Sequence, residues 1–213
     1  MIKIYKKIYK KIYEYMNIMN IFIIYSSIST VSCLYVELIG YLSHRFIIHQ
    51  GILGDNLRIT HYCHHEKKYP HYNFDSKKYR TAHDTWPWIL IIIIFAYIPN
   101  WLLFKLNIYD KYVMIYLLFL MSLHLVFISY IHDSYHIKNH WLNKYNWYKN
   151  HKKYHHIHHL DDKNYGITNY FYDHLFNTFS DKIVPKKNNF NGFESKCENR
   201  IKWLDFLSNW HFI

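Results

Sequence analysis

Cysteine, glycine and proline are scarce in this 213-residue sequence, which contains only three, five and four of them, respectively. The cysteines, Cys33, Cys63 and Cys197, are far apart, odd in number and form no CxxC pair. We therefore expect no disulfide framework, and a reducing compartment is the simpler interpretation. Cys33 falls in an apolar segment, whereas Cys63 lies inside a histidine motif and is a minor candidate for a pocket residue.

Acidic residues are also few, with 15 Asp and Glu against 26 Lys and Arg, so the formal net charge is +11. Such an excess is typical of proteins that bind nucleic acid, lie on an anionic membrane or expose loops to the cytosol. Because the sequence contains no recognised nucleic-acid motif, we do not expect nucleic acid as a partner. Hydrophobic residues make up 51% of the chain, which excludes disorder for most of it, and the length suits one domain.

Apolar segments indicate an integral membrane protein. Three stretches are long enough to cross the hydrocarbon core of a bilayer: residues 21–42, 86–104 and 112–131. The connector 105–111 is short, so the last two stretches form a hairpin that returns the chain to its starting side. Residues 43–85 and 132–213 then share one face of the membrane, and they carry 19 of the 26 Lys and Arg residues. The positive-inside rule predicts that this face is cytosolic.

The two ends of the chain differ from this central region. Residues 1–20 repeat an Ile-Tyr-Lys-Lys pattern, which indicates either a basic amphipathic helix on the membrane surface or low-complexity drift. Residues 181–213 form a tail in which 200–213 is predicted to be an amphipathic helix that packs against the domain or the membrane interface. Glu37, inside the first span, must be neutral, paired or beside a polar cavity.

Histidine is the strongest signal, with 18 residues concentrated in short motifs. Four motifs hold the candidate metal ligands: His44 and His49; His61, His64 and His65; His132, His136 and His140; His155, His158 and His159. In an α-helix, residues separated by three or four positions share a face, so the rings of each of the last three motifs are predicted to point together, the third as one stripe. His44 and His49 are about 140° apart in an α-helix. They share a site only if the helix bends, and otherwise serve two sites.

Neutral imidazole is a good ligand for Fe, Zn, Cu and Ni. Since each ion takes roughly four to six ligands, these histidines suit two ions better than one. Soluble di-iron bundles use Glu and Glu-x-x-His ligands instead, and the only acids in these motifs are Glu66 and Asp133. The sequence therefore predicts a pair of metal ions held by histidine. His132 remains open between ligand and supporting donor, and Asp133 is a candidate acceptor that orients a ligand ring.

The motifs also match a known pattern in order. Along the chain they read HRxxxH at 44–49, HxxHH at 61–65, DxxHxxxH at 133–140, HxxHH at 155–159 and NYG…D-x-x-F-x-T at 164–178. Residues from about 35 to 180 thus resemble the fatty acid hydroxylase / sterol desaturase superfamily of membrane histidine-box di-iron oxygenases, and most of all the ceramide fatty acyl 2-hydroxylases. Asn177 replaces the usual glycine of the ending. The pair His132-Asp133 resembles sterol desaturases and carotenoid hydroxylases, and no haem-binding HPGG motif is present.

The resemblance implies an all-α integral membrane helical bundle over residues 21–180, with a cytosolic helical cap that holds a histidine-rich di-metal site. It implies two Fe ions, with Zn possible after purification, and O2-dependent hydroxylation of a membrane lipid, foremost a fatty acyl chain, in the endoplasmic reticulum. Electrons are expected from a separate carrier such as cytochrome b5 and its reductase. Basic residues beside the motifs suit such a carrier, although an ordinary solvated charge run is the preferred interpretation: Lys67, Lys68, Lys152 and Lys153.

Two alternatives remain open. The first is a sterol desaturase, sterol methyl oxidase or carotenoid hydroxylase of the same superfamily. The second is a non-catalytic membrane metal-binding protein.

Overall fold

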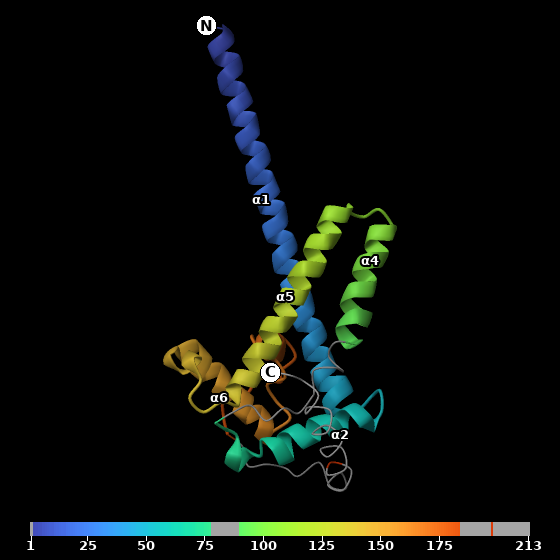
Figure 1. The fold of residues 1–213 in the computed structure, drawn as a ribbon, viewed down its shortest axis with the longest axis vertical. Coiled ribbons are helices and arrows are strands. Elements are labelled where there is room, and N and C mark those ends of the chain that lie inside the picture. The colour runs from blue at the N-terminus through green and yellow to red at the C-terminus, as the bar shows by residue number, and fades with distance from the viewer. Residues whose placement is uncertain (1, 78–89, 184–196, 198–213) are drawn as a thin grey trace.

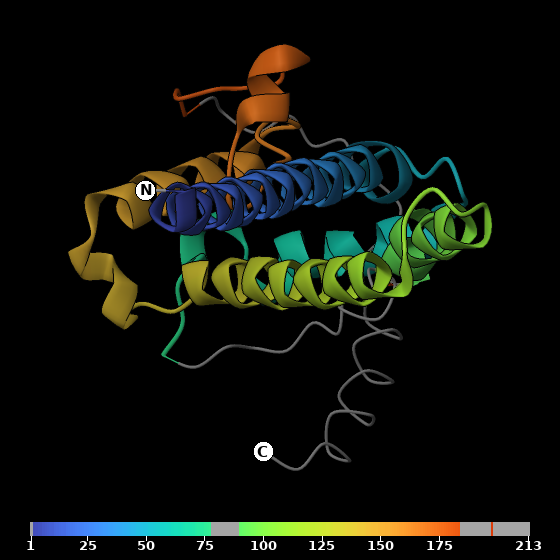
Figure 2. The same ribbon diagram turned by 90° about the horizontal axis from the view of Figure 1, so that it is seen from above.

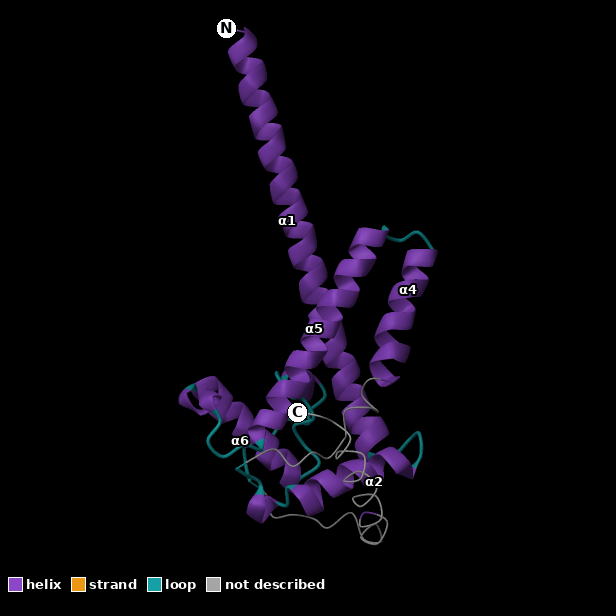
Figure 3. Cartoon of the chain, in the orientation of Figure 1, coloured by secondary structure: helices purple, strands orange, loops and turns teal. Residues whose placement is uncertain are grey.

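The computed structural model describes residues 2–77, 90–183 and 197, and this part of the chain consists of helices and loops without a strand (Figure 3). Two long helices, α1 and α5, lie side by side; α2 and α6 lie at one end of them, whereas α4 runs beside α5 (Figures 1 and 2). The α-helices are α1 (Ile2–Leu42), α2 (Asp55–Cys63), α4 (Ile98–Lys105), α5 (Lys111–Tyr135), α6 (Asn146–Leu160) and α7 (Phe171–Leu175).

Two of the helical segments are long and apolar enough to cross a membrane, Met19–His49 and Lys111–Tyr135. Few of their residues are buried inside the protein. Large apolar side chains point outward instead, with exposed fractions of 72% at Phe22, 64% at Phe119 and 67% at Val126. Apolar surface of this extent marks a face that lipid covers. The prediction of an all-α membrane protein is therefore confirmed.

The third predicted span is shorter than expected in the described part of the chain. Leu90–Lys105 forms an apolar helix that includes α4, and residues 86–89 lie outside the described residues. The turn after α4 leads directly into α5, whose first turn is capped by the Asp110 carboxylate, which accepts from the N–H groups of Tyr112 and Val113 at 2.8 and 3.0 Å. Figure 1 shows the resulting hairpin beside α1.

The N-terminal segment continues directly into the first predicted span. Residues 2–42 form one continuous helix, whose N-terminal part projects past the tip of the α4–α5 hairpin (Figure 1). The physical reason is local, because no proline or glycine occurs before Gly40 to interrupt the helix. The amphipathic helix predicted at 200–213 lies outside the described residues.

The expectation that the cysteines stay unpaired is wrong for two of them. Cys63 and Cys197 form a disulfide with a Cα–Cα distance of 5.5 Å, and both pack in a small core with Ile59 and Tyr62. The two residues are 134 positions apart, so sequence spacing could not reveal that the fold brings them together. Cys63 is therefore not a free pocket thiol, and Cys33 remains unpaired.

Candidate metal centre

Eight buried histidines converge in two groups of four at the end of the long helices. In each group the candidate ligand atoms all lie within 4.8 Å of one another. Group A consists of His44, His49, His61 and His158, and group B consists of His64, His136, His155 and His159. The hairpin thus brings together motifs that are separated by about half of the chain, as the predicted topology requires.

Both HxxHH motifs contribute to both groups. His61 belongs to group A and His64 to group B, although their rings stack with centroids 5.7 Å apart. On α6, His158 belongs to group A, whereas His155 and His159 belong to group B. The rings within each HxxHH motif lie close together, as predicted. Each motif, however, supplies candidate ligands to both groups and not to a single site.

A π-helical turn resolves the alternative that the spacing of His44 and His49 left open. Ser43–His49 forms a π-helix at the end of α1, in which backbone hydrogen bonds join residues five positions apart. Residues i and i+5 therefore come to the same side, and the two rings lie 5.1 Å apart, centroid to centroid. Both histidines belong to group A.

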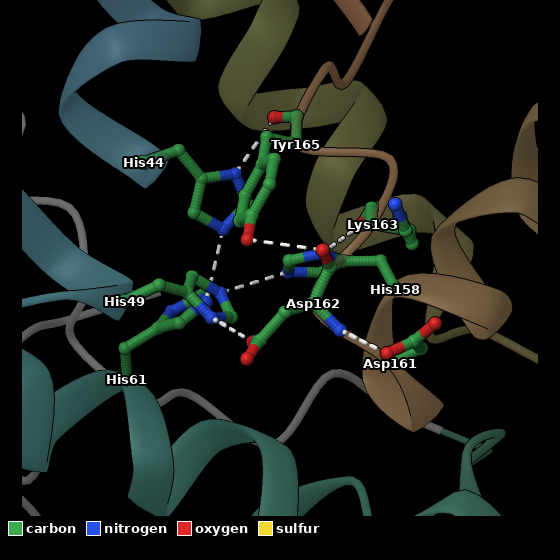
Figure 4. Close-up of polar contacts among 8 residues, drawn as sticks. All are labelled: His44, His49, His61, His158, Asp161, Asp162, Lys163 and Tyr165. Carbon is green, nitrogen blue, oxygen red and sulfur yellow. Dashed lines mark hydrogen bonds and ion pairs between the residues drawn. The ribbon is translucent and has the colours of Figure 1, made fainter. Parts of the chain in front are cut away.

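The outer ring nitrogens of three group A histidines are held by the segment directly after α6 (Figure 4). Three Nδ1 atoms meet acceptors there: His44 with the Tyr165 carbonyl at 2.7 Å, His158 with the Lys163 carbonyl at 2.8 Å and His49 with the Asp162 carboxylate at 3.0 Å. A neutral imidazole has a single N–H, so a ring that donates from Nδ1 presents a lone pair at Nε2. The three Nε2 atoms point into group A, which is the arrangement that metal-binding histidines adopt.

The contact between His49 and His158 suits a bound cation. Their Nε2 atoms are 3.2 Å apart, and both rings donate from Nδ1, so two lone pairs face each other. Only a proton or a metal ion between them makes this approach favourable. Burial, followed by repulsion from neighbouring histidines, lowers the pKa of His158 well below its usual range, which disfavours a proton on that ring. Group A therefore fits a metal ion.

Group B is supported by a different loop. The Nδ1 atoms of His136 and His159 meet the carbonyls of Phe74 at 3.2 Å and Tyr69 at 3.0 Å. Nε2 of His155 lies 3.1 Å from Nε2 of His136, and Nε2 of His159 is buried without a hydrogen-bond partner. Buried polar atoms are almost always satisfied, so the His159 nitrogen is suited to a ligand such as a metal ion. Burial and neighbouring histidines also lower the pKa of His155 and His159 well below the usual range, which keeps both rings neutral.

His65 and His132 lie against these groups without belonging to either. The His65 ring is 4.0 Å from His159 and 4.3 Å from His61, and its Nε2 is buried without a hydrogen-bond partner. The His132 ring lies 4.8 Å from His155, and its Nδ1 is 3.1 Å from the Asp133 carboxylate. His65 and His132 stay candidate ligands beside the two groups, and Asp133 stays the candidate acceptor that orients His132.

His140 is the one predicted ligand that the fold keeps apart. Helix α5 ends at Tyr135, so the predicted stripe through His132, His136 and His140 is wrong beyond His136. Instead, Nε2 of His140 lies 3.0 Å from the Tyr130 hydroxyl, and Nδ1 of His140 accepts a hydrogen bond from the Leu142 N–H at 3.4 Å.

The NYG…D-x-x-F-x-T ending has a structural role in group A. The buried Asp173 carboxylate accepts from the Tyr165 N–H, the Gly166 N–H and the Thr178 hydroxyl, each at 2.8 Å. A Cβ atom on Gly166 would lie 2.1 Å from the Asn169 carbonyl oxygen, so only glycine fits. These contacts fix the loop that presents the Tyr165 carbonyl to His44.

Sequence reasoning assigned no role to the residues that orient group A. The NYG motif could have pointed to the Tyr165 carbonyl, which accepts from His44. The sequence contains no comparable signal for Asp162, because an acid after a helix is common on any surface.

A cavity of about 80 Å³ leads from group A between α1 and α5. His44, His61 and His132 form its polar end. Most of its other walls are apolar, with Val36, Ile92, Leu125, Ile128 and Ile167 among them. Glu37 also lines the cavity and is paired, as expected, because its carboxylate contacts His124 Nε2 at 3.0 Å and accepts from the Thr168 hydroxyl.

Comparison with known proteins is consistent with this geometry. A sequence model described as Fatty acid hydroxylase matches residues 29–178, which is more than half of the chain and includes both histidine groups. No curated protein and no solved structure matches the chain.

Proposed function

Because the chain belongs to the fatty acid hydroxylase family, we propose that it is an O2-dependent membrane oxygenase that hydroxylates a fatty acyl chain of a lipid, similar to the ceramide 2-hydroxylases. The observation that carries this proposal is the cavity between α1 and α5, whose polar end is formed by His44 and His61 of group A. At about 80 Å³ the cavity has room for only a few methylene groups, so we propose that it takes the reacting segment of an acyl chain while the rest of the chain lies in the surrounding lipid.

We propose iron as the metal in both groups, with Zn as a replacement acquired during purification. When bound, the ions supply the activation of O2 that oxidation of an unactivated C–H bond requires. The protein contributes the rings of His44, His158 and His49, whose outer nitrogens are fixed by the carbonyls of Tyr165 and Lys163 and by the Asp162 carboxylate. It also contributes burial, because every histidine of both groups is at most 7% exposed, which keeps water from the reacting atoms.

The lipid is positioned by the cavity walls. We propose that the acyl chain contacts Val36, Leu125 and Ile128, which places one of its carbons beside His44 and His61. The His132–Asp133 pair at the same cavity favours a second candidate, oxidation of a sterol or carotenoid, because this pair is the feature that resembles those enzymes.

We further propose that electrons come from a separate carrier such as cytochrome b5 with its reductase, and that the protein resides in the endoplasmic reticulum with both groups facing the cytosol. The excess of Lys and Arg in residues 43–85 and 132–213 supports this orientation.

The test is lipid profiling after expression in a host that lacks its own acyl 2-hydroxylase. The wild type and the control His174→Ala, an exposed histidine outside both groups, are expected to produce 2-hydroxy acyl lipids, whereas His158→Ala produces none. Oxidised sterols or carotenoids in place of these lipids would favour the second candidate. Bound metal without any oxidised lipid, when O2 and a reductase are supplied, would identify a non-catalytic metal-binding protein.

A further inference from the structure

Helix α6 has two chemically different faces. One face buries His155, His158 and His159 in the metal groups. The other face carries residues at positions i, i+3, i+4 and i+7, which share one side of a helix: Lys149, Lys152, Lys153 and His156. This second face forms one wall of a cleft of about 570 Å³. The remaining cleft residues are Tyr72, Asn73, Phe74, Asp75 and Lys138.

The cleft is strongly basic and partly preorganised. It contains four lysines and a single carboxylate, that of Asp75. Asp75 forms an ion pair with Lys152 at 2.8 Å, and Lys152 also donates to the Ile137 carbonyl at 3.0 Å. Lys149 and Lys153 are exposed and form no ion pair with a carboxylate of the described residues. Their charge is therefore available to an anionic partner.

The floor of the cleft touches group B. The Phe74 ring lies 4.6 Å from the ring of His136 and 5.0 Å from that of His159, and the Phe74 carbonyl accepts from His136. The same ring lies 4.6 Å from His156, which lines the cleft. One side chain thus separates the surface of the cleft from two candidate ligands of a metal ion.

We propose that this cleft is the docking surface for an acidic one-electron carrier protein, which delivers electrons to group B past Phe74. This inference rests on the proposed function, because hydroxylation consumes two electrons. One C–H bond, one O2, two electrons and two protons give one C–OH group and one water. The carrier is oxidised in two one-electron steps, and the protons come from solvent.

A protein carrier fits the cleft better than a lipid headgroup does. The surface is concave, and it contains a carboxylate and an aromatic floor in contact with the metal ligands. An anionic headgroup would gain nothing from proximity to group B, whereas electron delivery depends on a short path. Opposite charges across such a surface also accelerate and orient the encounter of two proteins.

The test is binding of a labelled acidic carrier, the soluble haem domain of cytochrome b5, to the full chain in detergent. Lys149→Glu/Lys153→Glu is expected to weaken binding about tenfold, because two attractive contacts become repulsive. The matched control is Lys144→Glu, which reverses an exposed lysine outside the cleft and is expected to change binding less than about twofold. Higher salt should weaken binding of the wild type.

This assay needs no turnover, so its failure is distinct from failure of the proposed function. Absence of binding by the wild type, or an equal effect of the Lys149/Lys153 and Lys144 substitutions, would overturn the docking surface. So would loss of binding to phosphatidylserine vesicles in the double variant with carrier binding intact.

A second readout is the ratio of carrier-driven to dithionite-driven lipid oxidation, which is expected to fall in the double variant. An equal loss with dithionite would mean that the lysines act through the metal groups, whereas no oxidation by the wild type with dithionite contradicts the proposed function alone.

Discussion

Groups A and B have the same composition, four buried histidines each, but they differ in what supports them and in what they face. Group A is oriented by residues 162–165, immediately after α6, whereas group B is oriented by the carbonyls of Tyr69 and Phe74. Group A opens onto the cavity between the membrane helices, and group B lies behind the floor of the basic cleft. The same two HxxHH motifs therefore build two sites with different surroundings.

This difference fits the two tasks proposed for the centre. Under that proposal, group A faces the acyl chain and group B faces the electron carrier. His65 lies between the two, because its ring contacts His61 of group A and His159 of group B, whereas the His132 ring contacts His64, His136 and His155 of group B. Loss of either group is therefore expected to stop the reaction, whereas changes in the surroundings of one group should leave the other intact.

The largest expected effect comes from removing one ligand of each group. His158→Ala and His136→Ala should each lower lipid oxidation by more than about a hundredfold, beyond the effect of losing a supporting hydrogen bond. Turnover of a defined lipid by purified protein measures the loss, with His174→Ala as the control. If His136→Ala retained a large part of the activity, group B would be dispensable, and the view of one shared centre would be incorrect.

A smaller effect is expected from the support of group A alone. Asp162→Ala removes the acceptor of His49 and should weaken metal binding at group A about 10- to 100-fold. Competition with a chelator followed by metal analysis measures this affinity. Asp161→Ala is the matched control, because the Asp161 carboxylate accepts only from the neighbouring Asp162 N–H in the contacts seen here. Equal weakening at both groups would mean that they are not separately supported.

Filling the cavity tests whether group A faces the substrate. Gly40 lines the cavity, and a Cβ atom on it would meet no atom within 4 Å. Gly40→Leu should therefore lower oxidation of long acyl chains about tenfold and favour shorter ones, with metal content unchanged. Gly40→Ala, which adds only the Cβ, should have a much smaller effect. Unchanged chain preference in Gly40→Leu would place the substrate elsewhere.

The parts of the fold that the sequence predicted are those set by strong local signals. Apolar length identified the helices of α1 and α5, and histidine spacing identified all eight residues of the two groups. The membership of each group was not predictable, because it depends on the π-helical turn at Ser43–His49 and on the end of α5 at Tyr135. Neither feature has a distinctive residue such as proline or glycine at the point where it occurs.

Long-range contacts were also invisible in the sequence. The Cys63–Cys197 disulfide and the carbonyls that orient the histidines depend on the packing of distant segments. A backbone carbonyl is present at every residue, so no residue type marks the one that a histidine will contact. The tail motif was an exception, since its glycine and aspartate reveal a constrained loop.

The smallest effect expected is on stability. Burial lowers the pKa of His155 and His159 in the folded protein, so the unfolded chain binds more protons just below its own histidine pKa of about 6.5. The contribution of these two neutral rings to the free energy of unfolding is therefore complete above that pH, and it is lost as the pH falls below it. The metal-free protein should therefore melt lower at about pH 5.5 than at about pH 7.5, by roughly 2–4 °C for each kcal/mol lost.

Thermal unfolding in detergent measures this dependence. His155→Gln should reduce it, whereas the exposed His174→Gln should not. A melting temperature independent of pH in the metal-free wild type would contradict the buried, neutral state of these rings.

The most direct test of two separate metal groups is the number of ions bound per chain, counted by native mass spectrometry of the iron-loaded protein. We predict two ions in the wild type, one for each group, and one ion in each of His158→Ala and His136→Ala. A single ion in the wild type, or loss of both ions in either variant, would contradict the assignment of groups A and B as two sites.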